Sequence, residues 1–214
     1  MAEDLRQFLE GLEIAEPVSL AGYDLGAGVA YAFATANPER VARVAFMEFG
    51  LPGFGYEQAM QAAPDWHNGS NWHLSLFTLP DVAVQMLAGK ERELLSWFFW
   101  HLSYDHQAIG ADDFELYLRE LQKPGALRAM AEYYAAIWTD AEDNKRLLAN
   151  HGKLTLPVLA VGGERSAGPW VSQLFSPVAE NVRGVVIERA GHWLADENPA
   201  DLTDALITFF AEAG

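Results

Sequence analysis

The sequence contains no cysteine. This absence excludes disulfide bonds, a thiolate nucleophile and any metal site built on cysteine ligands, and it leaves the redox compartment open. We expect an activity that needs neither a cofactor nor a metal.

Basic residues are scarce. There are 14 lysines and arginines against 30 aspartates and glutamates, which gives a formal net charge of -16. A surface this negative repels the phosphate backbone of nucleic acids and anionic lipid headgroups. We therefore expect no nucleic-acid partner and no membrane partner.

Long apolar runs are also missing. No stretch reaches the roughly 18 apolar residues that a membrane-spanning helix needs. Residues 1–5 lack the basic and apolar regions of a signal peptide. The sequence predicts a cytoplasmic protein.

What is present is the balance of a folded globular chain. Of its 214 residues, 50% are hydrophobic, 12% are aromatic and 21% are charged. At roughly 150 residues per domain, this length allows one large domain or a core with an inserted subdomain.

Four short apolar runs alternate with helical patterns. The runs favour buried strands and cover residues 18–23, 41–46, 156–163 and 182–187. Helical spacing covers residues 4–12, 27–36, 170–175 and the segment from about Pro199 to Gly214. This alternation predicts an α/β fold, with a parallel sheet and flanking helices.

The middle of the sequence is different. Helical patterns cover residues 81–87, 92–102, 112–121 and 127–138. We find no convincing strand there, and aromatic residues such as Trp66 are frequent; most of them are expected to pack between helices. A long helical insertion between strands is expected to form a cap over the ligand end of the sheet. We therefore predict a core of residues 1–54 and 151–214 and an all-helical cap of residues 55–150.

A candidate nucleophile lies where the first strand turns into a helix, in Gly22-Tyr23-Asp24-Leu25-Gly26. A residue at such a tip has a strained backbone, and glycines two positions away on either side avoid clashes. The pattern is a nucleophile elbow with Asp24 where esterases carry serine. The simpler interpretation is that Asp24 only caps the following helix.

A candidate base follows the last predicted strand. His192, in Gly191-His192-Trp193, lies in a loop from which an imidazole could reach the carboxyl ends of the strands. Two carboxylates could orient it: Glu48, after the second strand, and Glu164, after the third. The residues alone leave this choice open.

These residues follow the order of a known family. The segments that carry the likeness are 22–31, 37–41, 157–163 and 191–199. They resemble the epoxide hydrolase and dehalogenase branch of the α/β-hydrolase superfamily, over nearly the whole chain. The resemblance implies that Asp24 is the nucleophile and His192 the base. It favours Glu48 over Glu164 as the acid partner of the histidine.

The resemblance also implies roles for cap residues. The family's Trp-His pair matches Trp72 and His73, and its tyrosine matches Tyr134 rather than the adjacent Tyr133. His73 and Tyr134 would then hydrogen-bond the oxygen of a small apolar epoxide. The Asp24 carboxylate would open the ring to form a covalent ester, and water activated by His192 would release a diol.

Dehalogenation through the same covalent chemistry is the alternative within this branch. Haloacetate dehalogenases carry arginines just after the nucleophile, which suit a substrate carboxylate, whereas this sequence has Leu25, Ala27 and Gly28 there. Haloalkane dehalogenases carry a tryptophan directly after it, whereas this sequence has Leu25. Trp72 is still a candidate for holding a halide.

Family members also carry a His-Gly-x-Pro turn before the elbow, and this sequence has none before Asp24. The turn supplies one oxyanion donor, so the backbone N–H of Leu25 would remain alone. Loss of one such donor costs on the order of 10²–10³ in rate. We expect an N-terminally shortened, truncated relative whose first strand forms an exposed sheet edge, with self-association or marginal stability as the result.

Two other classes of function fit parts of the sequence. A catalytically impaired relative could bind an apolar ligand beneath the cap without turnover. His101 and Asp105, spaced i and i+4, could share a helix face and hold a metal with His106. A polar helix end is the simpler interpretation of these three residues.

Overall fold

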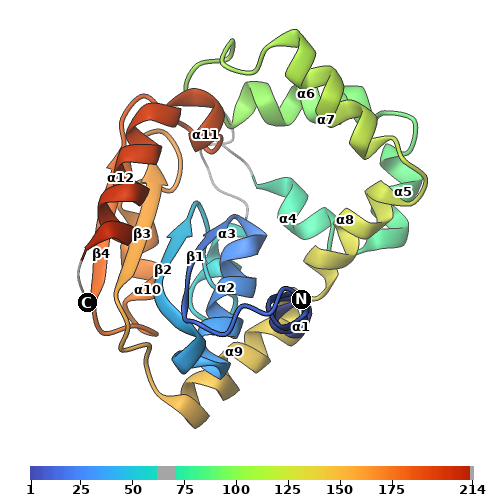
Figure 1. Ribbon diagram of the computed structural model, residues 1–214. Coiled ribbons are helices and arrows are strands. Elements are labelled where there is room, and N and C mark those ends of the chain that lie inside the picture. The colour runs from blue at the N-terminus through green and yellow to red at the C-terminus, as the bar shows by residue number, and fades with distance from the viewer. Residues whose placement is uncertain (62–70, 213–214) are drawn as a thin grey trace.

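The computed structural model describes residues 1–61 and 71–212 of the 214-residue chain. Trp66 of the predicted cap lies outside the described residues. Strands and helices alternate in both terminal parts of the chain, and helices make up the middle (Figure 1).

A four-stranded parallel sheet forms the centre of the molecule, in the order β1-β2-β3-β4. The strands are β1 (Val18–Tyr23), β2 (Val41–Met47), β3 (Val158–Gly163) and β4 (Val182–Ile187). The four predicted strands are confirmed to within two residues. Because the strands are parallel, their carboxyl ends lie at one edge of the sheet.

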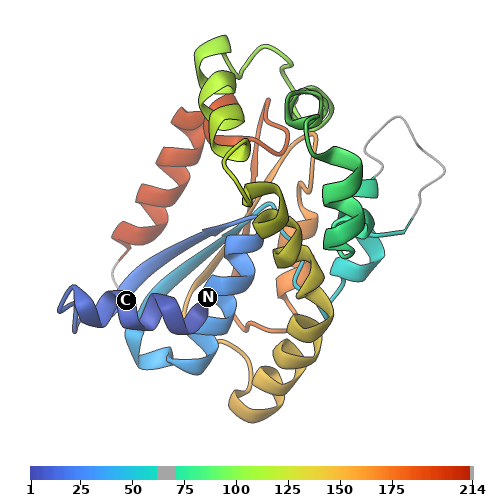
Figure 2. The same cartoon turned by 90° about the vertical axis from the view of Figure 1, so that its right-hand side faces the viewer.

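Helices cover both faces of this sheet, as expected for a parallel sheet. The flanking elements are α1 (Ala2–Gly11), α2 (Leu25–Ala36), η1 (Pro38–Arg40), α10 (Trp170–Phe175), α11 (Leu194–Glu197) and α12 (Pro199–Ala211). α2 and α12 lie on opposite faces of the sheet (Figure 2).

Alternate residues of the central strands build two separate packing layers. Val44 and Phe46 of β2 pack on the α2 and α10 side, where Phe46 stacks on Phe175 with ring centroids 4.1 Å apart. Ala45 and Met47 pack on the α12 side. Successive side chains of a strand point to opposite faces, so a strand covered on both sides is apolar along its whole length.

The first strand departs from the predicted burial. β1 pairs only with β2 among the described residues, and Ser19 and Ala21 are exposed while Gly22 is its one buried residue. The expectation of a buried strand over residues 18–23 is therefore wrong. Among the described residues the strand lies at the edge of the sheet, as expected for a relative shortened before the elbow.

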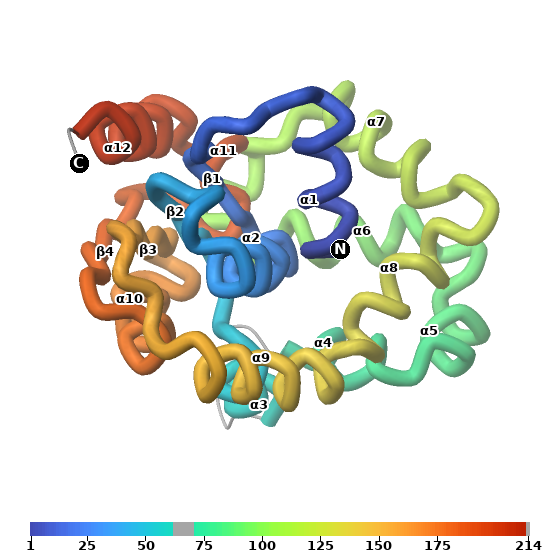
Figure 3. The backbone as a smooth tube through the Cα atoms, turned by 60° about the horizontal axis from the view of Figure 1, so that its bottom comes forward, coloured from blue at the N-terminus to red at the C-terminus, as the bar shows by residue number. Residues whose placement is uncertain are grey.

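All described residues between 55 and 150 lie in helices or loops. The helices are α3 (Tyr56–Ala59), α4 (Trp72–Leu76), α5 (Pro80–Leu87), α6 (Glu91–His101), α7 (Ala111–Leu121), α8 (Ala126–Ala135) and α9 (Ile137–His151). The predicted helix over residues 127–138 is interrupted at Ala136, and α9 was not predicted. Figure 3 shows α5, α7 and α8 on the side of the molecule away from the sheet, and α9 running back past α2 towards the sheet.

The helical insertion is thus confirmed, and the fold is the predicted α/β architecture. The division into a core and a cap at residues 54 and 150 stays a prediction. Over residues 1–61 and 71–212, no helix has the length and apolar character needed to cross a membrane.

Candidate active site

Asp24 occupies the single residue between β1 and α2. Its φ of 49° and ψ of -129° place it in a region that non-glycine residues rarely adopt. Its N–H donates to the carbonyl of Met47 at 2.9 Å, and its own carbonyl accepts from Ala27 N–H at 2.8 Å. The Asp24 side chain makes no capping hydrogen bond to α2. The helix-cap interpretation is therefore wrong, and the carboxylate is free for other contacts.

Only one of the two elbow glycines is required by close packing. A Cβ added at Gly22 would lie 2.6 Å from both the Cα of Ala27 and the carbonyl oxygen of Gly26. A Cβ added at Gly26 would meet nothing within 4 Å. The expectation that both glycines avoid clashes is wrong for Gly26, because that position faces open space.

Glu48 directly follows β2 and is held by its backbone and its side chain. Its N–H donates to the carbonyl of Val161 at 2.9 Å. The side chain is 1% exposed. Oε1 accepts from Gly163 N–H at 2.6 Å, and Oε2 accepts from Ser166 Oγ at 2.5 Å. Buried carboxylate oxygens need such donors, because burial removes the hydrogen bonds that water would make.

Glu48 also contacts the predicted base. Its Oε2 lies 3.0 Å from Nδ1 of His192. Glu164, the other candidate, is exposed and accepts a hydrogen bond from Arg189 N–H at 2.8 Å. The residues alone did not decide between Glu48 and Glu164. In the structure, Glu48 is the one that contacts the imidazole.

His192 lies between Glu48 and Asp24. Its Nε2 is 3.7 Å from Oδ2 of Asp24, which is ion-pair distance. The backbone fixes the ring further, because His192 N–H donates to the carbonyl of Leu102 at 2.7 Å and the Tyr23 hydroxyl donates to the carbonyl of His192. The three predicted catalytic residues therefore converge, although they lie far apart in the sequence.

The two carboxylates control the charge of this imidazole. Burial lowers the pKa of His192, but its contacts with the carboxylates of Asp24 and Glu48, together with their negative charges, outweigh burial and raise the pKa to about 10. The ring therefore keeps its proton at neutral pH.

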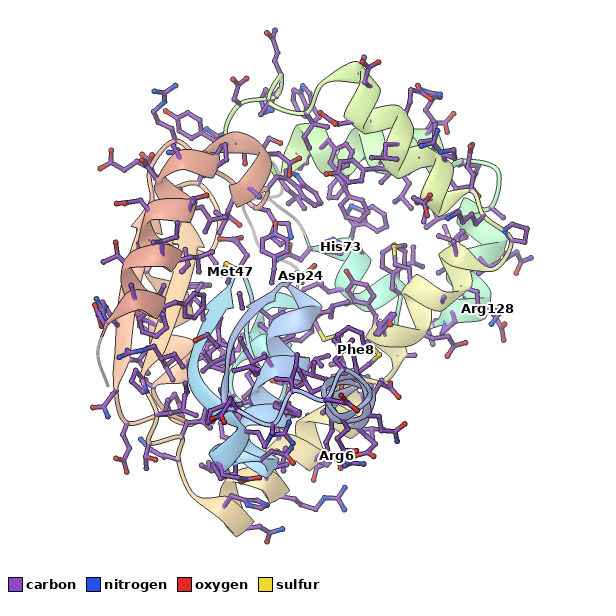
Figure 4. All side chains as sticks on the ribbon, in the orientation of Figure 1. Arg6, Phe8, Asp24, Met47, His73 and Arg128 are labelled. Carbon is purple, nitrogen blue, oxygen red and sulfur yellow. The ribbon has the colours of Figure 1, made fainter. Side chains whose placement is uncertain are left out.

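A cavity of about 700 Å³ opens beside these residues. Asp24, Leu25 and His192 line it from the sheet side, and His73 and Tyr134 line it from the helical insertion. Figure 4 labels Asp24 and His73, which lie next to each other where the insertion faces the sheet. The remaining wall is mostly apolar and includes Phe98, Phe99 and Leu121 of α6 and α7.

His73 and Tyr134, on the insertion side, are both uncharged at neutral pH. Burial lowers the pKa of His73 to about 4, although the charge of Asp24 acts in the opposite direction. Burial and the charge of Asp24 raise the pKa of Tyr134 well above its usual range. At neutral pH the site thus presents a neutral imidazole and a protonated phenol, and both can donate a hydrogen bond.

Two predicted alternatives lie outside the cavity wall. Tyr133 is 44% exposed, and its hydroxyl lies 3.6 Å from the sulfur of Met1. Trp72 packs against Trp97 and Phe98 behind His73, with ring centroids 5.0 Å and 6.3 Å away. Neither residue lines the cavity, so the geometry gives no support to a halide site at Trp72.

The metal alternative has no geometric support in the described part of the chain. There, no three histidine, aspartate or glutamate side chains form a group that could hold an ion. α6 ends at His101, so Asp105 does not share its helix face. His101 instead stacks on Trp97, and His106 stacks on Trp100, each with centroids 4.6 Å apart.

Three contacts of the site were not predicted from the sequence. Ser166 donates to Glu48, Tyr23 holds the carbonyl of His192, and Leu102 accepts from the backbone of His192. Tyr23 lies inside the elbow motif, which predicts where this residue lies but not that its hydroxyl binds the carbonyl of His192. Ser166 and Leu102 belong to no motif.

The sequence and the structure were compared with known proteins. The profile described as "Alpha/beta hydrolase family" matches residues 1–205. A soluble epoxide hydrolase from a Corynebacterium species is 29% identical over 99% of this chain and 72% of its own length. Human epoxide hydrolase 4 is 24% identical over 98% of this chain and 57% of its own length.

Solved structures give the same result. Cfl2 from Burkholderia cenocepacia is 35% identical, with a TM-score of 0.90 over 98% of this chain and 70% of that one. The epoxide hydrolase CorEH is 28% identical, with a TM-score of 0.82 over 98% of this chain and 73% of that one. The relatives are thus longer than this chain, and the shared part includes the sheet, the helical insertion and the cavity residues between them.

Proposed function

The chain belongs to the alpha/beta hydrolase family, and from this premise we propose that it is an epoxide hydrolase acting through a covalent ester on Asp24. The observation that carries the proposal is the contact series from Glu48 through His192 to Asp24 at the wall of a largely apolar cavity. The substrates would be a small apolar epoxide and water.

In the first step, one carboxylate oxygen of Asp24 attacks a ring carbon of the epoxide. A carbon–oxygen bond forms, the ring carbon–oxygen bond breaks, and its electron pair stays on the ring oxygen. His73 and Tyr134 lie on the opposite wall of the cavity and can donate hydrogen bonds to that oxygen as charge develops. Their neutral, protonated forms suit this role, because a donor must carry its proton at the pH of the reaction.

In the second step, His192 takes a proton from a water molecule that attacks the ester carbonyl of Asp24. The bond from the carbonyl carbon to the substrate oxygen breaks, and this oxygen takes the proton from the imidazolium. The ring oxygen already carries the proton that His192 released after ester formation, so the diol leaves complete. The carboxyl group of Asp24 then returns its proton to His192, which restores the carboxylate and the imidazolium. Glu48 supports the charged imidazole through Nδ1. The N–H of Leu25, at the first turn of α2, would face the developing oxyanion, because such N–H groups have no partner within their own helix.

The order of these steps agrees with the electrostatics. In the free enzyme His192 carries its proton, so it cannot yet act as a base. Ester formation removes the negative charge of Asp24, and with it one cause of the raised pKa of His192. The imidazolium then releases its proton more easily, and this proton ends on the ring oxygen. The neutral imidazole becomes available to water.

The first experiment is turnover of styrene oxide and epibromohydrin, with diol and halide release measured separately. Diol without halide supports the proposal, and halide release would favour dehalogenation. Mass spectrometry of His192→Ala should then find one substrate adduct on Asp24. His106→Ala is the matched control, because this exposed histidine lies outside the cavity. Absence of both product and adduct with every epoxide and haloalkane would favour an apolar binding protein.

A further inference from the structure

One carboxylate joins the His192 loop to the helical insertion. Oε1 of Glu197, the last residue of α11, accepts from Tyr104 N–H at 2.5 Å and from Asp105 N–H at 2.9 Å. Its Oε2 accepts from Gly191 N–H at 2.7 Å. Two of the three donors, Tyr104 and Asp105, lie shortly after the end of α6 at His101, and the third directly precedes His192.

The two segments also meet backbone to backbone. His192 N–H donates to the carbonyl of Leu102 at 2.7 Å. A Cβ added at Gly191 would lie 2.2 Å from that carbonyl oxygen and 2.8 Å from the nitrogen of Tyr104. On its other side the loop touches the end of β3, because a Cβ added at Gly163 would lie 2.0 Å from the carbonyl oxygen of Gly191. The loop is therefore held between the segment after α6 and the sheet.

The position of this loop decides the geometry of the imidazole. His192 must keep Nδ1 on Glu48 and Nε2 toward Asp24, at 3.0 Å and 3.7 Å. Displacement by about 1 Å is enough to lose a large part of the advantage of such an arrangement. Glu197 does not line the substrate cavity, so its influence on the reaction must pass through the residues that it holds.

We propose that Glu197 is a positioning residue, which aligns His192 with Glu48 and Asp24 by binding the histidine loop to the segment after α6. This role rests on the proposed function, since it assigns to His192 the hydrolysis of the ester. Three N–H donors from two segments require two acceptor oxygens, which a carboxylate provides. A glutamine has only one acceptor oxygen. Its NH₂ group would face at least one backbone N–H, which is also a donor, so one segment would lose its acceptor.

The proposal predicts that the two chemical steps respond differently. Ester formation uses Asp24, His73 and Tyr134, which Glu197 does not touch. Ester hydrolysis uses His192, which Glu197 positions. Loss of the carboxylate should therefore slow hydrolysis and leave ester formation nearly unchanged, so that the ester accumulates.

The test compares Glu197→Gln, Glu197→Asp and Glu164→Gln in single turnover of styrene oxide. Glu164 is the matched control, because it also accepts a backbone N–H beside this region but holds neither His192 nor the segment after α6. We expect ester hydrolysis to slow about tenfold or more in Glu197→Gln, with ester formation within about twofold of wild type. Glu197→Asp should recover part of the loss. Equal slowing of both steps, or no change in a folded variant, would overturn the role.

A second readout does not depend on turnover. Nuclear magnetic resonance should show that Glu197→Gln lowers the pKa of the His192 imidazole toward its ordinary value, and that the amides of residues 104, 105 and 191 exchange faster. Glu164→Gln should leave both unchanged. If wild type forms no ester, the proposed function fails, and this measurement alone decides the role of Glu197. An unchanged titration and unchanged exchange in folded Glu197→Gln would contradict it.

Discussion

At the scale of the residue, Asp24 alone forms the turn from β1 into α2. Its positive φ brings the first turn of α2 back against the strand, so that the Ala27 backbone lies over Gly22. The atoms closest to Gly22 belong to the backbone and cannot move aside as a flexible side chain would. The elbow therefore depends on the absence of a side chain at Gly22.

The two glycines of the motif should respond in opposite ways to alanine. Gly22→Ala should lower the free energy of unfolding by about 1–3 kcal/mol or more, because the new methyl group overlaps fixed backbone atoms. Gly26→Ala should raise it by about 0.5–1 kcal/mol, because alanine is the better helix former and meets open space. Urea unfolding of both variants checks this, and equal effects would contradict the packing argument.

The imidazole of His192 should make stability depend on pH. Its pKa in the folded protein is about 10, above the ordinary value of about 6.5 in an unfolded chain. Its stabilising contribution is therefore fully present below about pH 6.5 and is lost as the pH rises through about 10. Urea unfolding of wild type and His192→Gln should show a stability difference that shrinks across this interval. A difference independent of pH would show that the ring is not protonated in the native state.

At the scale of the element, β1 offers an unpaired edge within the described residues. Its exposed Ala21 carries no charge that would prevent another strand from pairing there. The net charge of -16 opposes association of two copies, and salt screens that repulsion.

We therefore expect light scattering to show self-association that increases with chain concentration and with salt. Ala21→Lys should weaken it, because a lysine on an edge strand disfavours pairing. Ala200→Lys, which adds the same charge at an exposed position of α12, is the control. A chain that is monomeric in every salt and at every concentration would contradict this prediction.

Strands and flanking helices were predictable because their patterns are local. An apolar run bounded by proline or glycine, as in β1 and β3, marks a strand whatever its neighbours are. Whether β1 is buried depends on its place in the sheet, which no local pattern contains. The break between α8 and α9 at Ala136 was not predicted either. Alanine is a good helix former, so the local sequence contains no signal that a helix ends there.

The candidate site was predictable where motif and family resemblance coincide. Asp24 and His192 stand in glycine-containing segments, and Glu48 was preferred over Glu164 through the resemblance. The contacts that hold these residues in place were not predictable. Ser166 donates one hydrogen bond to Glu48, and Glu197 accepts three from backbone N–H groups, mostly between segments distant in the sequence. Their residue types are common in loops, so only the fold reveals their partners.

At the scale of the whole molecule, the acidic character of the chain extends into the cavity. Asp24, Glu120 and Asp196 line it, and no lysine or arginine does so among the described residues. Like charges brought together in a poorly solvated site cost several kcal/mol. The cavity is therefore suited to neutral substrates.

This predicts a preference that kcat/KM can measure. A neutral epoxide such as styrene oxide should be turned over at least about tenfold more efficiently than an oxirane carboxylate of similar size. Asp196→Asn should reduce the difference in kcat/KM between the two substrates. It should raise kcat/KM for the anionic substrate and change it little for the neutral one. Equal efficiency for both would show that the carboxylates do not reach the bound substrate.

The position of the helical insertion also determines when the site can form during folding. β2 and β3 are neighbours in the sheet, yet residues 48–157 lie between them in the chain. Closing so long a segment costs chain entropy before the pairing yields any stabilisation. Glu48 precedes the segment, while Gly163 and Ser166 follow it. An intermediate in which the helices have formed but these two strands remain apart would lack a competent carboxylate, so catalytic ability is gained late in folding.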